Sequence, residues 1–169
     1  MVMHLIGSHG PTYFQRYPKE MAHFQPDCPR ADIENCSVEQ IVNTYDNTIR
    51  YTDFVMSQGI EQLTALQDKY NTAVIYLSDH GESLGENGLF LHGMPYSLAP
   101  DFQTHVPMIV WMSDGFKQAK GINVDCLSRE AQKNSYSHDN LFHSLLGIMD
   151  ITTEAYDNKM DIFAHCRTL

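Results

Sequence analysis

Apolar residues recur at steps of three and four along a central segment of the chain, between positions 41 and 66. The positions that follow this spacing are Ile41, Tyr45, Ile49, Thr52, Met56, Ile60, Leu63 and Leu66. Residues spaced in this way share one face of an α-helix, which is typical of an amphipathic helix packed against a core. Ser37, with Gln40 three residues later, has the form of a capping box. The pattern therefore predicts one long helix that begins after Ser37.

Two short apolar runs, Thr72–Leu77 and Val106–Met112, have the length and composition of buried strands. A further run, Met1–Ile6, comes first in the chain and is predicted to be a strand that leads into a glycine-containing loop. In chain order, Thr72–Leu77 and Val106–Met112 are then the second and third runs. Strands that alternate with helices indicate an α/β fold, with a mostly parallel sheet sandwiched by helices. The segment between the second and third runs, residues 80–104, is a long loop of the kind that is usually functional in compact domains.

The length of 169 residues suits a single domain, and the 43% hydrophobic content is that of a globular protein. No apolar run approaches the roughly 20 residues that span a bilayer, and no signal peptide opens the chain. Because the sequence starts inside a predicted core strand, we expect residues 1–169 to be one partial domain of a larger protein. The net charge of −10 argues against nucleic-acid partners and against adhesion of this segment to anionic membranes.

Four cysteines allow three pairings, and the sequence alone does not choose among them. Cys28 and Cys36 flank a short polar loop, so a local disulfide is one expectation, with Cys126 and Cys166 then joining the C-terminal segment to an earlier loop. Four reduced thiols, or a cysteine zinc site, are the alternatives. No C-x₂-C spacing supports a zinc site of that kind. Disulfides would place the chain in an oxidising compartment.

Candidate chemistry begins where the second strand ends, at Asp79 and His80. The carboxyl ends of buried strands are common ligand sites in α/β proteins, and carboxylate and imidazole groups both bind Zn²⁺. The simpler interpretation is a turn at the end of a strand, with Asp79 bonding to the backbone and His80 on the surface. Glu82, which follows closely, could orient His80 from behind, although a solvated loop carboxylate is the commoner outcome, and the same holds for Glu86.

Two further histidines have a setting that favours function. His92 follows Asp79 by thirteen residues on the far limb of the long loop, and His9 lies between glycine and serine neighbours after the first run. Each could contact a phosphate or a second metal, or could instead be a structural histidine bonded to a backbone carbonyl. Asn43, Thr44 and Asn47 could line a substrate pocket from the long helix, or could face solvent.

Four co-linear segments carry a family resemblance. They are Gly7–Tyr13, Val42–Thr48, Ser78–Gly88 with its continuation to Pro95, and Thr104–Met108. Together they closely resemble the phosphoethanolamine transferases of Gram-negative inner membranes, which include lipid A-modifying enzymes associated with polymyxin resistance. The resemblance extends over nearly the whole chain and implies an alkaline phosphatase/sulfatase-like α/β fold. It further implies a periplasmic catalytic domain tethered by N-terminal transmembrane helices outside this sequence.

The same resemblance implies roles for individual residues. Asp79 and His80 match two of four zinc ligands of the family, while His9 and His92 match histidines near the substrate phosphate, where a second zinc is sometimes held. The other two zinc ligands, a glutamate and the nucleophilic threonine, lie in a part of the family sequence that precedes this one. The implied reaction moves phosphoethanolamine from phosphatidylethanolamine to lipid A through a covalent intermediate. We therefore expect this chain alone to be inactive.

Two alternatives remain at this stage: a phosphomonoester or phosphodiester hydrolase of the same superfamily, and a folded fragment without catalysis. Sulfatase chemistry itself is disfavoured, because sulfatases of this superfamily carry a cysteine within C-x-P-x-R. The segment Cys28-Pro29-Arg30 is too compact to match that pattern.

Overall fold

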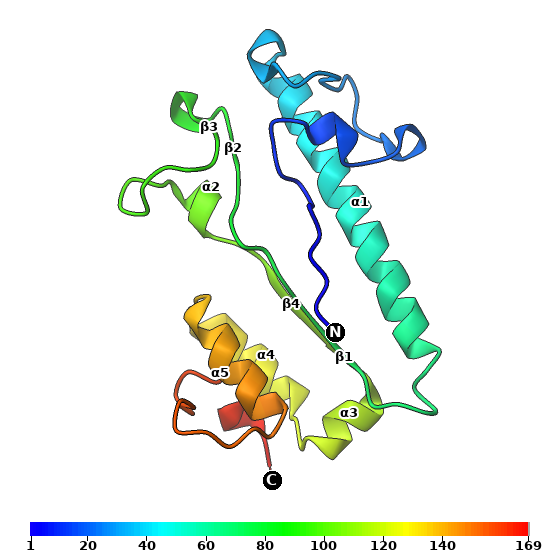
Figure 1. Cartoon of the computed structure of the whole chain (residues 1–169), viewed down its shortest axis with the longest axis vertical. Coiled ribbons are helices and arrows are strands. Elements are labelled where there is room, and N and C mark those ends of the chain that lie inside the picture. Colours follow the sequence, from blue (N-terminus) through cyan, green and yellow to red (C-terminus); the bar gives the residue numbers. More distant parts are fainter. Residues whose placement is uncertain (169) are drawn as a thin grey trace. The chain divides into compact units, whose positions relative to one another are not determined.

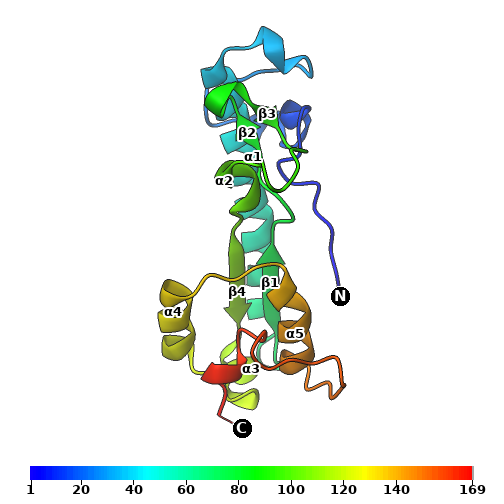
Figure 2. The same cartoon turned by 90° about the vertical axis from the view of Figure 1, so that its left-hand side faces the viewer.

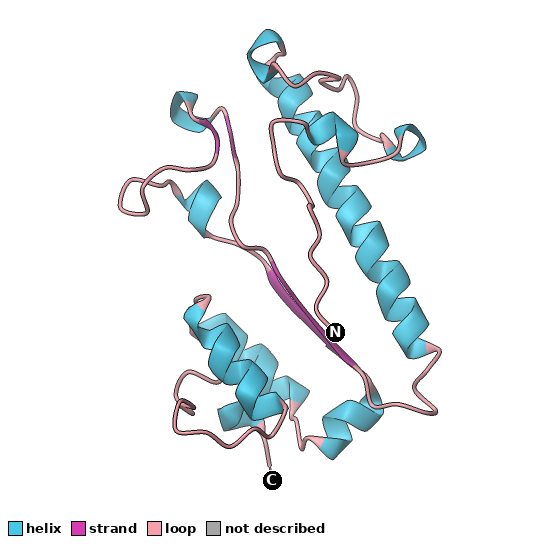
Figure 3. Cartoon of the chain, in the orientation of Figure 1, coloured by secondary structure: helices cyan, strands magenta, loops and turns pink. Residues whose placement is uncertain are grey.

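The computed structural model describes residues 1–168 as helices and short strands joined by loops (Figures 1 and 3). The elements in chain order are α1 (Val38–Thr64), β1 (Ala73–Leu77), β2 (Ser83–Leu84), β3 (Phe90–Leu91), α2 (Asp101–Thr104), β4 (Met108–Met112), α3 (Asp114–Ala119), α4 (Val124–Lys133) and α5 (Asp139–Ile148). Contacts group the chain into two compact units: Met1–Gln62 with Tyr76–Ile109, and Leu63–Ile75 with Val110–Leu169. The single domain expected from the sequence stays a prediction.

The long helix α1 begins where the capping box places it. The Ser37 backbone N–H donates to Gln40 Oε1 at 2.9 Å, and the Gln40 backbone N–H donates to Ser37 Oγ at 3.2 Å. Both N–H groups would otherwise lack a partner within the helix, so the reciprocal bonds fix its first turn. The predicted helix is thus confirmed. Within the described residues, no helix is both long and apolar enough to span a membrane.

The buried face of α1 is more polar than its spacing predicts. Ile41 is buried as expected, but Ile49 is 47% exposed, whereas Thr44, Asn47 and Thr48 are fully buried. The chain that precedes the helix folds back over this face and brings backbone N–H groups that need acceptors. The Cys28 N–H, for example, donates to Thr44 Oγ1 at 2.6 Å. Polar side chains therefore occupy positions that an apolar pattern would assign to a core.

The first unit has a small core where the N-terminal segment, α1 and the β2–β3 hairpin meet. Its buried members are Tyr13, Cys28, Ile33 and Ile41, and Leu84 packs against them. Cys28 and Cys36 form a disulfide across the short polar loop before α1, as expected. In the chain-entropy picture, a loop this short contributes about 2–3 kcal/mol of stability.

Both described strand pairs run antiparallel. Strands β1 and β4 are neighbours, and the bonds at their two ends join the Ser78 N–H to the Pro107 carbonyl and the Ser113 N–H to the Thr72 carbonyl. Strands β2 and β3 also pair antiparallel. The parallel direction that the sequence predicts is not seen in either pair. Parallel pairing needs a connection that crosses over the sheet, usually through an α-helix, whereas residues 78–107 between β1 and β4 form the β2–β3 hairpin and the four-residue helix α2.

Two further strand expectations fail for a common reason. Residues 1–6, predicted to be a strand, form an exposed loop (Figure 3). Strand β1, predicted to be buried on both faces, is only half-buried along its length. A strand is stabilised when its N–H and C=O groups pair with neighbours and its faces are covered. Within the described residues, the first segment has no strand partner and β1 has one.

The second unit has its own core around Ile122, Ile148 and Phe163, against which Ile75 and Val110 pack. Helices α4 and α5 lie on one side of the residues of β1 and β4 that belong to this unit (Figures 1 and 2). A disulfide joins Cys126 on α4 to Cys166 near the end of the chain. The second expected pairing is therefore confirmed. It closes a much longer loop and contributes about 4 kcal/mol in the same entropy picture.

Candidate active site

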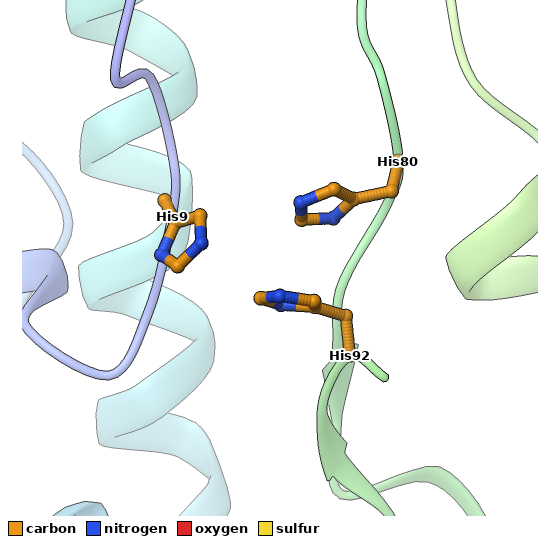
Figure 4. A group of neighbouring side chains, drawn as sticks. All are labelled: His9, His80 and His92. Atoms are coloured by element: carbon orange, nitrogen blue, oxygen red, sulfur yellow. The ribbon is translucent and has the colours of Figure 1, made fainter. Parts of the chain in front are cut away.

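Three histidines that are far apart in the sequence converge in the first unit (Figure 4). One ligand atom of each ring, in His9, His80 and His92, lies within 4.8 Å of the others. The His80 and His92 rings stack with their centroids 4.0 Å apart, and the His9 ring meets the His92 ring edge-on at 4.8 Å. The structure therefore brings together three of the four residues singled out for metal or phosphate chemistry.

The histidines on the long loop are placed by a strand end and a hairpin. Strand β1 ends at Leu77, and His80 follows it after Ser78 and Asp79. Beyond it the chain forms β2, turns and returns as β3, with Ser83 opposite Leu91 in the register. The antiparallel return delivers His92 to a position beside His80. A two-residue strand pair is a weak structure alone, and the buried Ser83 hydroxyl, which accepts a bond from Gln103, supports it.

The third histidine, His9, belongs to the N-terminal segment and is held from two sides. The hydroxyl of the preceding Ser8 lies 2.6 Å from the hydroxyl of Thr48 on α1. The Arg16 guanidinium donates to the His9 carbonyl at 3.3 Å, and the His9 N–H donates to the Ile6 carbonyl at 3.2 Å. Helix α1 thus positions this turn, although no residue of α1 belongs to the histidine cluster.

Two of the rings have their Nδ1 atoms engaged by the backbone. In His9 and in His80, Nδ1 faces the carbonyl oxygen of the following residue, at 2.7 and 3.0 Å. A carbonyl oxygen only accepts hydrogen bonds, so Nδ1 carries the proton in each neutral ring. The Nε2 lone pair of each ring is then available for a metal ion or a proton.

Asp79 stands at the edge of the cluster. Its carboxylate is 84% exposed, and its Oδ2 atom lies 3.9 Å from His80 Nε2. Two ligands of one tetrahedral zinc lie about 3.3–3.5 Å apart, given zinc–ligand distances near 2.0–2.2 Å. Asp79 and His80 therefore need only a small adjustment to share one ion. One imidazole and one carboxylate are donors that zinc accepts, so this pair fits the metal that the family resemblance implies.

Glu82 is the residue that sequence reasoning undervalued. Its carboxylate is only 3% exposed and does not contact His80, contrary to the outer-shell role considered for it. Instead, Oε1 accepts from the Gly10 N–H at 3.1 Å and lies 3.1 Å from His92 Nδ1, while Oε2 accepts from the Tyr13 hydroxyl at 3.1 Å. The sequence could not show this burial, because the partners from the N-terminal segment lie about 70 positions away.

The tyrosine that contacts Glu82 stays protonated. Burial raises the pKa of Tyr13 far above its ordinary value, and the neighbouring Glu82 carboxylate raises it further. Burial, followed by the charge of Glu82, also raises the pKa of Tyr45, whose ring meets the Tyr13 ring edge-on. Tyr13 is therefore a fixed hydrogen-bond donor to Glu82 and takes no part in proton transfer near neutral pH.

Other candidates lie outside the cluster. Glu86 accepts from the Leu84 N–H at 2.6 Å and supports the turn between β2 and β3. His105 is exposed and is not part of the group of potential ligands. Cys28 is held in its disulfide with Cys36, so it provides no free thiol for sulfatase-type chemistry.

Comparison with known proteins identifies the family. The sulfatase family matches residues 1–151. The chain belongs to this family. The phosphoethanolamine transferase EptA of Salmonella typhimurium is 50% identical over 169 residues, which is all of this chain and 31% of that protein. The phosphatidylethanolamine transferase Mcr-1 of Escherichia coli is 36% identical over 159 residues, covering 94% of this chain and 28% of that one.

Solved structures give the same assignment. The lipooligosaccharide phosphoethanolamine transferase A of Neisseria meningitidis matches with a TM-score of 0.93 and 47% identity over 97% of this chain, both as its soluble domain and as the integral membrane protein. The match covers 49% of the soluble domain and 31% of the integral membrane protein. This chain therefore spans about a third of the full-length relatives. The expected α/β fold of the sulfatase family is confirmed.

Proposed function

We propose that this chain forms part of the active site of a zinc-dependent phosphoethanolamine transferase. Asp79 and His80 are its zinc ligands, and His9 and His92 contact the phosphoryl group. The observation that carries the proposal is the convergence of three imidazoles beside an exposed carboxylate. Relatives of the chain with 50% and 36% identity are named a phosphoethanolamine transferase and a phosphatidylethanolamine transferase, which supports this chemistry.

Zinc bound by Asp79 and His80 would polarise a phosphoryl oxygen and lower the pKa of an attacking hydroxyl. The chain's own groups act around that oxygen. With Nδ1 bonded to the Gly10 carbonyl, His9 has Nε2 to present to the phosphoryl group and so orients it. His92 lies 4.8 Å from His9 between ring centroids, so both rings are able to face one phosphoryl group.

We infer the whole reaction from the family resemblance and the names of the relatives. A threonine hydroxyl loses its proton and displaces diacylglycerol from the phosphorus of phosphatidylethanolamine. A lipid A phosphate oxygen then displaces the threonine oxygen, which regains a proton, so that one difficult step becomes two. The resemblance places that threonine, and a glutamate ligand, in the part of the relatives that residues 1–169 do not match. We therefore propose that this chain alone catalyses no transfer. The complete enzyme acts at the periplasmic face of the inner membrane and is held there by N-terminal helices.

Zinc titration of the purified chain tests the metal site. Losing an outer-shell partner typically weakens metal affinity by about 10–100-fold. Asp79→Ala and His80→Ala each remove a proposed ligand, so we expect a larger loss of zinc affinity from each. His105→Ala is the matched control, because it removes an exposed imidazole outside the cluster and should leave the affinity unchanged. Equal affinities for the wild type and the two ligand variants would refute the assignment of these ligands.

A transfer assay tests the proposal that the chain needs its missing part. Vesicles that contain fluorescent phosphatidylethanolamine and lipid A should show no transfer with this chain. A chain extended to the threonine and glutamate should transfer the headgroup and lose that activity with His80→Ala. Release of ethanolamine phosphate to water by the extended chain, without labelled lipid A, would favour the hydrolase alternative instead.

A further inference from the structure

The buried carboxylate of Glu82 connects both sides of the histidine cluster. It bonds to the N-terminal segment through the Gly10 N–H and the Tyr13 hydroxyl, and it lies 3.1 Å from Nδ1 of His92. A buried carboxylate is costly unless its oxygen atoms are bonded, and here both have partners. Since Gly10 directly follows His9, one carboxylate touches the backbone beside one histidine and the ring of another.

The contact with His92 has a chemical consequence that differs from packing. An ionised carboxylate accepts hydrogen bonds and donates none, so the Nδ1 atom that faces it must carry the proton of the neutral ring. The free imidazole side chain favours the other tautomer, with the proton on Nε2. In that tautomer Nε2 would carry the proton and could not bind a metal ion. The lone pair on Nδ1 would then face the Glu82 oxygen.

We propose that Glu82 is a positioning residue of this site. It holds His92 in the Nδ1–H tautomer, so that the Nε2 lone pair is available to a metal ion or to a proton. It also fixes the turn that carries His9. With Glu82 in this role, all three rings have Nδ1 facing an oxygen acceptor, which leaves the Nε2 lone pair of each ring for a ligand. The inference rests on the proposed function for its biological purpose, but the tautomer itself is a property of the metal-free chain.

The decisive measurement is the tautomer of His92 in the metal-free protein. Two-bond ¹H–¹⁵N spectra of the chain labelled with ¹⁵N-histidine distinguish a protonated from an unprotonated ring nitrogen. They would be recorded at about pH 8.5, where free imidazole is neutral. The His92 signals are identified by their loss in His92→Gln. We expect Nδ1 protonated and Nε2 bare. A dominant Nε2–H tautomer in the wild-type chain would overturn the proposal without any variant.

Three variants separate positioning from simple support of the fold. Glu82→Met removes the acceptor at similar size, so the His92 tautomer should shift to Nε2–H. Glu82→Gln keeps an acceptor oxygen within reach of the ring, and it should retain the Nδ1–H form. Tyr13→Phe removes another bond to the same carboxylate and should leave the tautomer unchanged. A retained Nδ1–H form in folded Glu82→Met would contradict the role. If that variant does not fold, the wild-type and Glu82→Gln spectra still decide.

Zinc titration of the same proteins separates this proposal from the proposed function. Glu82 contacts His92 and neither of the proposed zinc ligands, so we expect Glu82→Met to weaken zinc binding by much less than Asp79→Ala or His80→Ala does. Glu86→Gln changes a carboxylate in the same loop that contacts no histidine, and it should bind as the wild type does. The Nδ1–H tautomer without zinc binding would preserve the positioning role and refute the metal site. Zinc binding with the Nε2–H tautomer would do the reverse.

Discussion

Replacement of Asn47 by alanine tests why a polar side chain occupies the buried face of α1. Asn47 is fully buried, and its side chain bonds to the chain that precedes the helix. Its Oδ1 accepts from the N–H groups of His23 and Phe24, at 2.7 and 2.8 Å, and its Nδ2 donates to the Phe24 carbonyl at 3.0 Å. The alanine variant would lose three hydrogen bonds from one position.

The magnitude follows from these contacts. Three bonds at about 1 kcal/mol each give about 3 kcal/mol, from which the better helix propensity of alanine subtracts up to about 0.7 kcal/mol. We expect Asn47→Ala to lower the free energy of unfolding by about 2–3 kcal/mol. Asn43, one turn earlier, is the matched control because it makes one exposed bond, to the Pro26 carbonyl. Its replacement by alanine should change stability by less than about 0.5 kcal/mol.

Urea unfolding under oxidising conditions measures both variants against the wild type. The Asn47→Ala midpoint should fall with an unchanged slope, and its melting temperature should drop by about 5–10 °C. At temperatures where the Asn47→Ala variant is folded, its zinc affinity should equal that of the wild type, because the side chain lies outside the histidine cluster. Equal stability losses for the two asparagine variants would refute the reasoning that burial and bond number set the cost.

Two further predictions follow from the same structure. A methyl group at Gly81 would overlap the Phe102 carbonyl oxygen, whereas one at Gly59, inside α1, would meet nothing. Thermal unfolding should therefore show Gly81→Ala to be destabilised by about 1–3 kcal/mol and Gly59→Ala to be stabilised by about 0.5–1 kcal/mol; stabilisation of both would contradict the overlap. Burial and a 2.8 Å bond to Asp161 raise the pKa of Tyr156 from 10.0 to about 12. Tyr156 deprotonates more easily in the unfolded chain, so stability should fall between pH 10 and 12, and by less in Tyr156→Phe, as denaturant titrations at each pH would show.

Local sequence signals predicted the elements well where neighbours in the chain decide them. The capping box of Ser37 and Gln40 formed as expected, because both partners lie within one helical turn. The end of β1 at Leu77 and the Asp79-His80 pair beyond it were also visible in the sequence. The direction of strand pairing was not visible, since it depends on whether a connection crosses over the sheet, and an apolar run looks the same in either direction.

The candidate site shows the same division. The sequence singled out His9, His80 and His92 by type and setting, but their convergence depends on a hairpin and on a turn held against α1. Glu82 was indistinguishable from a solvated loop carboxylate until its distant partners were known. The polar face of α1 was missed for the same reason, because Asn47 and its partners are more than 20 positions apart.

By itself, then, the sequence determined the long capped helix, the two apolar strands β1 and β4, the family and the chemical types available for the site. Tertiary structure alone decided which strands pair antiparallel, which polar side chains are buried, and which carboxylate faces His92. Helix periodicity, caps and short disulfide loops arise from interactions over a few residues, so they are encoded locally. Burial of a polar group depends on a partner that only the folded chain brings within about 3 Å, and no local pattern records it.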